Sequence, residues 1–238
     1  MKFKLYHLGN SRSQRIIWLL ESLKLDYELI FCERNRQGLA PEWLKTIHPL
    51  GKVPILVIEE NQHNEKIVLA ETSAIFDFLA IKFATHELFS SENFTAQQLA
   101  NHCYFKKFAD SSLMPNLALK QIFARIVSHS PWIAKLITGK IKHTFDQKFL
   151  NPSIFEQLAM IDDLLKQQKF LVNDNLKAVD ILMEFMLSAL AVSIPKFQPF
   201  QNIQRYLNDL HDLQSYQQAV IKGQFDQAEF VHYWQQAW

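Results

Sequence analysis

Pro54 stands directly before the apolar run Ile55–Ile58, and this arrangement restricts the fold more than any other short stretch of the chain. The run has the β-branched and aliphatic residues of a buried strand. Proline cannot donate a hydrogen bond to a sheet, so it belongs at the first residue of a strand or on an edge. The backbone amide and carbonyl of Val53 then have no evident partner in their own sheet, and an extended peptide-like ligand could pair with them. An ordinary turn that contains Gly51 is the simpler interpretation of the same residues.

The segments around this strand predict a mixed α/β unit. Strands are predicted at Phe3–Leu8, Tyr27–Cys32, Lys52–Ile58 and Lys66–Ala70, with a polar hairpin loop at Glu59–Glu65. One amphipathic helix follows the turn Gly9–Ser13, and another follows Ser73. Because a helix joins the first two strands, these strands are expected to be parallel. The order is that of the thioredoxin fold, a four-stranded mixed sheet with helices on both faces.

Beyond residue 95 the pattern favours helices alone, because apolar residues recur at intervals of three and four. Helices are predicted at 96–127, 131–148, 152–168, 179–193, 201–210 and 213–221, with joints at Pro115, Pro131, Pro152 and Pro195. We therefore expect a thioredoxin-like domain at 1–84, a linker at 85–95 and an all-α domain at 96–238. The aromatic residues of the tail are expected to pack back on the protein; they are Phe225, Phe230, Tyr233, Trp234 and Trp238.

Composition indicates a cytoplasmic protein without a metal. The net charge of +1 gives no excess that would recruit nucleic acid. The only two cysteines, Cys32 and Cys103, are far apart, which argues against a disulfide framework or a zinc site and favours a reducing compartment. Both lie in apolar surroundings and are expected to be buried and inert. The N-terminus has no secretory pattern, and the longest apolar run, Ile181–Pro195, contains Glu184 and is too short to span a bilayer.

Three groups in the first domain could form a ligand site if this fold is correct. Ser11 lies near a helix N-terminus, where a hydroxyl and unpaired amides can stabilise a thiolate. Lys52 offers a cation beside Val53 for a ligand carboxylate. Thr72, at the start of another helix, suits a carboxylate, and Glu71 suits an ammonium group. Together they describe a site for a zwitterionic, extended thiol peptide.

Each of these residues also has a simpler structural explanation. Ser11 or Ser13 could do no more than cap the helix that follows. Lys52 could be a solvated lysine, and Glu71 a favourable acid at the start of a helix.

The three groups lie within motifs that resemble those of cytosolic glutathione transferases, and the likeness covers essentially the whole chain. The motifs are Leu5–Arg15, His48–Pro54 and Leu69–Ile75. Within that family the closest match is to the serine-type enzymes of bacteria and fungi, because Ser11 stands four residues before Arg15.

This resemblance implies roles for the candidate residues. Pro54 would be cis, Val53 would pair with the cysteinyl backbone of glutathione, and Lys52 would lie near the glycyl carboxylate. Glu71 and Thr72 would bind the γ-glutamyl end, and His48, in the same loop as Lys52, is a further glutathione-binding candidate. Ser11 would be the catalytic residue that activates the thiol.

The resemblance also implies an activity. A homodimeric detoxification transferase would conjugate glutathione, its co-substrate, to small hydrophobic electrophiles held by the helical domain, with glutathione-dependent peroxidase activity as an additional expectation. A non-catalytic ligand-binding or protein-interaction module of the same fold is the alternative. Tyr6 is an alternative thiol activator, although its place inside a strand favours a packing role.

Two sequence features depart from the family pattern. Thr72 replaces a serine but keeps the hydroxyl and the amide. The family pattern has a Ser/Thr-x-x-Asp capping box at the start of a buried helix, and Asp180 matches its last residue. Lys177 occupies the position of the Ser or Thr, so the hydroxyl that would cap the helix is lost. Asn175 could replace it by shifting the helix start.

From Ser111 to Phe145 the chain has no acidic residue, and basic residues alternate there with large apolar ones. Such a stretch can lie on a membrane surface. We favour instead a helix hairpin whose apolar face packs in the core and whose rim lines a hydrophobic substrate pocket.

Overall fold

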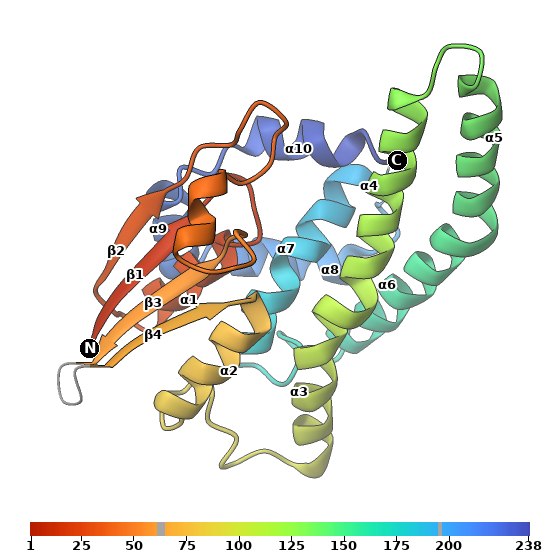
Figure 1. The fold of residues 1–238 in the computed structure, drawn as a ribbon. Helices are drawn as coiled ribbons and strands as arrows, with labels where there is room; N and C mark the ends of the chain where they lie inside the picture. The colour runs from red at the N-terminus through yellow and green to blue at the C-terminus, as the bar shows by residue number, and fades with distance from the viewer. Residues whose placement is uncertain (61–64, 195–196) are drawn as a thin grey trace. The chain divides into compact units, whose positions relative to one another are not determined.

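The computed structural model describes residues 1–60, 65–194 and 197–238 and is shown in Figure 1. The chain forms two compact units. The first comprises Met1–Glu92 and His211–Asp226, and the second comprises Asn93–Leu210 and Gln227–Trp238. The first unit therefore contains a segment from late in the chain. The assignment of 85–95 as a linker stays a prediction.

The first unit contains a four-stranded mixed sheet. Its strands are β1 (Lys2–His7), β2 (Tyr27–Phe31), β3 (Ile55–Glu60) and β4 (Glu65–Ala70). They lie in the order β2-β1-β3-β4, with β1 parallel to β2 and with β3 antiparallel to both β1 and β4. The predicted strand directions are confirmed. Most of the predicted hairpin loop, residues 61–64, lies outside the described residues.

The described residues of this unit also form four helical segments: α1 (Gln14–Ser22), the short η1 (Glu42–Thr46), α2 (Thr72–Lys82) and α9 (Gln214–Lys222). The late segment is fixed to α1 by specific contacts. The ring of Trp18 lies edge-on to that of Tyr216, with 5.0 Å between centroids, and the Trp18 Nε1–H donates to Ser215 Oγ at 3.1 Å. Helix α1 is thus covered on one side by residues almost 200 positions away.

All secondary-structure elements in the described residues of the second unit are helices. Its helices are α3 (Ala96–Phe108), α4 (Met114–His129), α5 (Lys135–Phe145), α6 (Asn151–Leu165), α7 (Ala178–Ser193), α8 (Gln201–His211) and α10 (Gln227–Gln235). A thioredoxin-like domain followed by an all-α domain is the fold class that the sequence predicts. The tail does pack back, because Phe230 and Trp234 of α10 lie against Phe185 of α7, at ring-centroid distances of 5.4 and 6.3 Å.

The expected joints at Pro115 and Pro152 are wrong, whereas the one at Pro131 is confirmed. Pro115 and Pro152 each lie in the first turn of a helix that continues directly from a π-helical turn, Ala109–Leu113 or Asp146–Leu150. Inside a continuous helix a proline lacks the N–H for the i→i−4 hydrogen bond, and the π-helical turn before it is a place where that hydrogen-bond pattern already shifts. Helix α4 does end just before Pro131. Pro195 lies outside the described residues.

Helix α7 begins without help from Asn175. Its first residue is Ala178, and the buried Asp180 carboxylate accepts the Lys177 N–H at 2.8 Å. The same carboxylate accepts the Leu171 N–H at 3.0 Å and the Tyr206 hydroxyl at 2.9 Å. Asp180 therefore satisfies the helix start and joins α7 to the preceding loop and to α8.

The expectation that the basic hairpin packs its apolar face in the core is wrong for α5. This helix has no buried residue. Its inner face is only half-buried, along Thr138, Gly139 and Lys142, while Leu136, Ile137 and Ile141 are exposed. An 11-residue helix that packs along one side leaves the apolar residues of its opposite side exposed.

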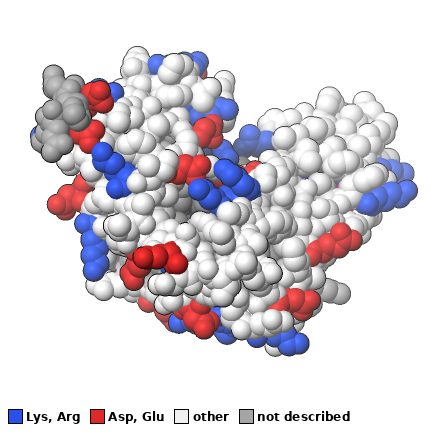
Figure 2. Space-filling view, turned by 90° about the horizontal axis from the view of Figure 1, so that it is seen from below, with Lys and Arg blue, Asp and Glu red and all other residues white. Residues whose placement is uncertain are grey.

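Charged side chains of both signs are spread over the face seen in Figure 2, where neither forms a continuous patch. This distribution agrees with the small net charge of +1. Within the described residues, none of the helices has the length and apolar character needed to cross a membrane.

Candidate functional site

Sheet topology places three chain segments at one end of the sheet. Tyr6, near the end of β1, is opposite Ile55, the first residue of β3, and Ile55 is opposite Ala70, the last residue of β4. The turn after β1, the loop before β3 and the start of α2 therefore emerge together. These segments carry Ser11, Val53 and Glu71, the three groups that the sequence predicts to converge.

Ser11 lies in the turn between β1 and α1 and is partly exposed. Its hydroxyl oxygen is 2.8 Å from the Leu8 carbonyl oxygen and 2.7 Å from Ser13 Oγ, and it accepts the Ser13 N–H at 3.3 Å. Ser13 is fully buried and its side chain makes no capping hydrogen bond to α1. The cap explanation is therefore wrong for Ser13. Of the two hydroxyls, that of Ser11 is the one accessible to a ligand.

A buried histidine, His7, fixes the direction of these hydrogen bonds. Its Nε2 lies 3.0 Å from the carbonyl oxygen of Gly223, so Nε2 carries the hydrogen and donates it. In the neutral ring Nδ1 is then an acceptor, and the Ser13 hydroxyl donates to it at 2.7 Å. Ser13 Oγ is left as an acceptor for the Ser11 hydroxyl and for the Leu8 N–H, which lies at 3.3 Å.

His7 cannot serve as the base for a thiol. Burial lowers the pKa of His7 to about 4, despite the opposing hydrogen bond to Gly223. An ordinary thiol has a pKa of about 8.5, so moving its proton to His7 would cost about 6 kcal/mol. His7 stays neutral and holds the Ser13 hydroxyl in place.

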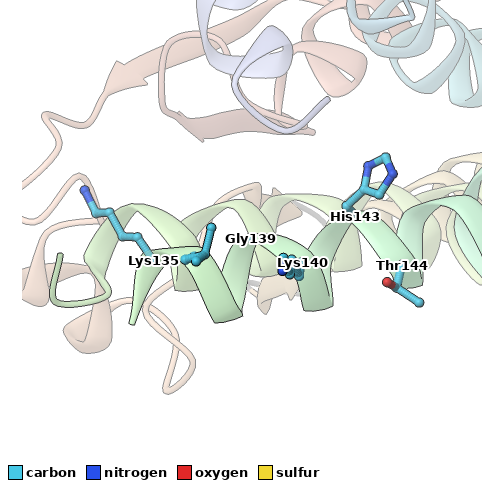
Figure 3. Close-up of a pocket in the computed structure, with 6 residues that line it drawn as sticks. Lys135, Gly139, Lys140, His143 and Thr144 are labelled. Carbon is cyan, nitrogen blue, oxygen red and sulfur yellow. The ribbon is translucent and has the colours of Figure 1, made fainter. Parts of the chain in front are cut away.

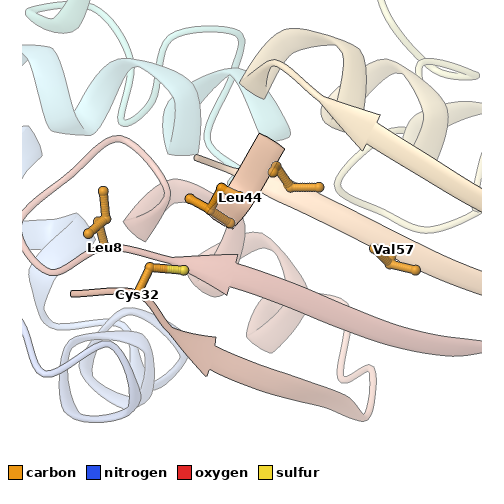
Figure 4. Packing of buried hydrophobic residues seen from close by; sticks show 5 residues of the cluster. Leu8, Cys32, Leu44 and Val57 are labelled. Atoms are coloured by element: carbon orange, nitrogen blue, oxygen red, sulfur yellow. The ribbon is translucent and has the colours of Figure 1, made fainter. Parts of the chain in front are cut away.

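The loop before β3 presents the backbone of Val53. The Val53–Pro54 peptide bond is cis, as the resemblance implies. The Val53 side chain packs against the cluster of Leu8, Cys32, Leu44, Ile55 and Val57, four of which are labelled in Figure 4. Its backbone N–H and C=O form no hydrogen bond with any residue that the structure describes. An inward side chain with unpaired backbone groups is the arrangement that strand addition by a ligand requires.

Neighbouring residues shape this loop. Gly51 has φ +58°, and a Cβ there would lie 2.7 Å from Lys45 Cγ, so glycine suits both the conformation and the space. Lys52 is exposed and forms no ion pair with a described residue. The half-buried His48 accepts the Leu50 N–H at Nδ1, at 3.3 Å, and so orders the turn.

At the start of α2, Glu71 has the unusual backbone angles φ 74° and ψ 126°. Non-glycine residues in such regions are strained and cluster at functional sites. Thr72 is buried, and its Oγ1 accepts a hydrogen bond from Arg15 Nη2 at 3.4 Å. The Thr72 hydroxyl hydrogen has no acceptor among the described residues. Glu71 is exposed beside it, so an anion-binding hydroxyl and a carboxylate stand together.

Tyr6 and the two cysteines are less suited than Ser11 to act on a thiol ligand. Tyr6 packs against the cluster below Val53 and lies 6.1 Å from the Trp43 ring, which suits a packing role. Cys32 is buried as expected, and burial raises the pKa of its thiol. The expectation for Cys103 is wrong, because this cysteine is exposed on α3. Among the described residues there is no cluster of His, Cys, Asp and Glu that could hold a metal ion.

Three residues near the site were not foreseen as part of it: His7, Gly223 and Arg15. His7 could have been noticed as a polar residue at the end of an apolar strand. Gly223 gave no signal, because it lies 216 residues away from its hydrogen-bond partner. Arg15 belongs to a motif, but its contact with Thr72 depends on how α1 and α2 pack.

The buried His7 predicts a loss of stability in mild acid. Its folded pKa of about 4 is below the ordinary value of 6.5, so the native state favours the neutral ring. This contribution is complete above pH 6.5 and is lost as the pH falls toward 4, by about 3 kcal/mol in all. Urea unfolding across this range should show a shallower pH dependence in His7→Phe than in the parent protein. An NMR titration in which the His7 ring protonates near pH 6.5 would contradict the prediction.

Comparison with known proteins gives consistent matches. Residues 11–81 match the model of the glutathione S-transferase N-terminal domain. The chain is 29% identical over 224 residues to glutathione S-transferase 1 of Saccharomyces cerevisiae, covering 92% of this chain and 94% of the relative. It is 29% identical over 208 residues to glutathione S-transferase 3 of Schizosaccharomyces pombe, covering 87% and 82%.

Comparison with solved structures also gives matches to glutathione transferases. A glutathione S-transferase of Actinobacillus pleuropneumoniae is 27% identical, with a TM-score of 0.69 and coverage of 94% of this chain and 93% of that one. A glutathione transferase homologue of Lodderomyces elongisporus, solved with two glutathione molecules per subunit, is 20% identical with a TM-score of 0.69, covering 93% and 99%. The latter match supports the fold alone.

Proposed function

We propose that this protein is a member of the glutathione transferase family that conjugates the thiolate of glutathione to apolar electrophiles. The observation that carries the proposal is the unpaired backbone of Val53, at the same end of the sheet as Ser11 and Glu71. Glutathione is an extended tripeptide, and its cysteinyl backbone would pair with Val53 as an added strand.

Charges on either side of Val53 suit the two ends of glutathione. The glycyl carboxylate would lie near Lys52, with His48 in the same loop. The γ-glutamyl carboxylate would accept the free hydroxyl hydrogen of Thr72 at the N-terminus of α2, where the helix dipole also favours an anion. Glu71 would bind the neighbouring ammonium group. The strained backbone of Glu71 is of the kind that clusters at ligand-binding sites.

Ser11 would act on the sulfur. Its hydroxyl would turn from Ser13 and Leu8 to donate to the thiolate, while the Ser13 N–H continues to donate to Ser11 Oγ. A hydrogen bond to a charged acceptor is worth about 1.5–3 kcal/mol, which lowers a thiol pKa by about one to two units. The thiolate then attacks the electrophile, the carbon–sulfur bond forms and the leaving group departs.

Several finer points belong to the same proposal. The accessible Ser11 favours the serine-type branch of bacteria and fungi. An activated thiolate could also reduce hydroperoxides, forming a disulfide with a second glutathione. The helical unit would hold the hydrophobic electrophile, and the protein would be a homodimer. Two unpaired cysteines suit the cytoplasm.

Titration calorimetry with glutathione and steady turnover of chlorodinitrobenzene test this function. Binding with turnover supports a transferase. Binding without turnover of this or other electrophiles supports the alternative, a non-catalytic module of the same fold. Absence of glutathione binding would refute the transferase and favour the protein-interaction form of the alternative.

Replacing Glu71 by glutamine should weaken glutathione binding about tenfold, because the ammonium group would lose a charge-assisted hydrogen bond of about 1.4 kcal/mol. The melting temperature should stay unchanged, since Glu71 is exposed and its backbone is preserved. Glu65→Gln, a similarly exposed change on β4, is the matched control and should bind normally. Equal affinities for the two variants, measured by calorimetry, would contradict the role of Glu71.

A further inference from the structure

The hairpin of α4 and α5 carries a concentrated set of exposed apolar side chains. The two helices run side by side and are joined by a loop at one end (Figure 1). Trp132 in this loop is 83% exposed, and Ile133 beside it is 70% exposed. Along the helices the exposed apolar residues are Ile122, Ile126, Leu136, Ile137 and Ile141. Clusters of this kind on a folded protein mark sites of interaction.

Positive charge surrounds these apolar residues. From 111 to 145 the chain has no acidic residue. Arg125, Lys135 and Lys140 are exposed and form no ion pair with any described residue. Lys135, Lys140 and His143 are spaced along α5 beside a shallow hollow of about 380 Å³, shown in Figure 3.

The other two lysines of the hairpin, Lys120 and Lys142, do not contribute charge to its outer face. Lys120 and Lys142 both turn inward to the buried Asp146, with Nζ–Oδ2 distances of 3.5 and 2.5 Å. The first carboxylate that follows α5 in the sequence is therefore already occupied by two cations. Nothing on the hairpin is left to neutralise Arg125, Lys135 and Lys140, so the outer face is cationic as well as apolar.

We propose that the face formed by Trp132, Ile133, Leu136, Ile137 and the neighbouring lysines binds the surface of an anionic lipid bilayer. Tryptophan and branched aliphatic side chains at the end of a hairpin suit the boundary between lipid headgroups and acyl chains. Lysine side chains can lay their methylenes along the apolar surface and keep their charged ends at the phosphates.

A second copy of the chain fits this face less well than an anionic bilayer does. A two-fold axis brings the same patch of both subunits together. If the hairpins of two subunits packed on each other, their cationic residues would face one another, with no acidic residue between 111 and 145 to pair with them. An apolar electrophile is too small to cover a surface that extends from Ile122 to Ile141.

The test uses the full chain and flotation with phosphatidylcholine vesicles, with and without phosphatidylglycerol. Binding is expected to the anionic vesicles at low salt and to fall as salt rises. The double variant Lys135→Glu/Lys140→Glu should lower the affinity at least about tenfold. Lys24→Glu/Lys166→Glu, the same charge change at exposed positions elsewhere, should lower it far less. Equal losses in both variants would overturn the proposal in favour of attraction by overall charge.

An apolar variant tests the hairpin independently of charge. Trp132→Ser/Ile133→Ser should abolish flotation, whereas Ile81→Ser, at an 81% exposed position on α2, should not. Activity with glutathione should be unaffected, which distinguishes this proposal from the proposed function. Absence of flotation of the parent protein at low salt would overturn the proposal. Smaller assemblies of the serine variant in sedimentation would also overturn it, because they indicate a contact between subunits. A raised KM of that variant for the electrophile would do the same, because it indicates a substrate site.

Discussion

Asp180→Ala is expected to lower the free energy of unfolding by about 3–5 kcal/mol, a large effect for a single substitution. The carboxylate is fully buried and accepts hydrogen bonds from the Leu171 N–H, the Lys177 N–H and the Tyr206 hydroxyl. Alanine would leave two backbone donors and one hydroxyl buried without an acceptor. Urea unfolding followed by far-ultraviolet circular dichroism measures the loss.

The control for Asp180 is Tyr206→Phe, which removes one donor and leaves both backbone hydrogen bonds in place. It should cost about 1 kcal/mol. If Asp180→Ala costs no more than Tyr206→Phe, the carboxylate does not organise the start of α7. Another group would then replace the side-chain cap that Lys177 cannot provide.

Ser11→Ala is expected to reduce kcat/KM for conjugation by about 10- to 100-fold near neutral pH. The reason is the loss of one hydrogen bond to the glutathione thiolate. The thiol pKa in the complex should rise by about one to two units, so the activity lost at neutral pH should largely return in alkaline solution. The pH dependence of kcat and the ultraviolet absorbance of bound thiolate both measure this shift. Glutathione affinity should change little.

Matched variants separate the hydroxyl of Ser11 from the structure around it. Ser11→Thr keeps a donor at this position and should restore much of the activity. Ser13→Ala removes a buried hydroxyl that holds Ser11, so its effect on the thiol pKa should be smaller than that of Ser11→Ala. An unchanged pH profile in Ser11→Ala would refute the assignment, and Tyr6→Phe would then be the next variant to test.

Much of the fold could be predicted from the sequence because its signals are local. The period of two in the strands and of three to four in the helices depends on neighbouring residues alone. Pro131 and Pro115 show where this reasoning fails. Both are prolines within helical sequence, but only Pro131 follows the end of a helix, while Pro115 continues from a π-helical turn. Whether a helix ends or continues at a proline depends on which backbone N–H and C=O groups find hydrogen-bond partners in the folded chain.

The candidate site also has a part that the sequence determined and a part that depends on the folded structure. The sequence by itself determined the chemical groups: a hydroxyl at Ser11, an unpaired backbone at Val53, and an acid and a hydroxyl at Glu71 and Thr72. Their motifs are short and contiguous, so their spacing is visible without coordinates. Only the sheet register, with β3 antiparallel to both of its neighbours, decides that the three segments emerge at one end.

What only the tertiary structure decided are contacts between distant parts of the chain. His7 is held by Gly223, 216 residues later, and this contact makes Ser13 an acceptor for Ser11. Helix α5 has an amphipathic sequence, yet none of the elements that the structure describes buries its apolar side. Sequence periodicity shows which side chains share a face of a helix. Whether that face meets protein, ligand or lipid depends on what the folded chain places against it.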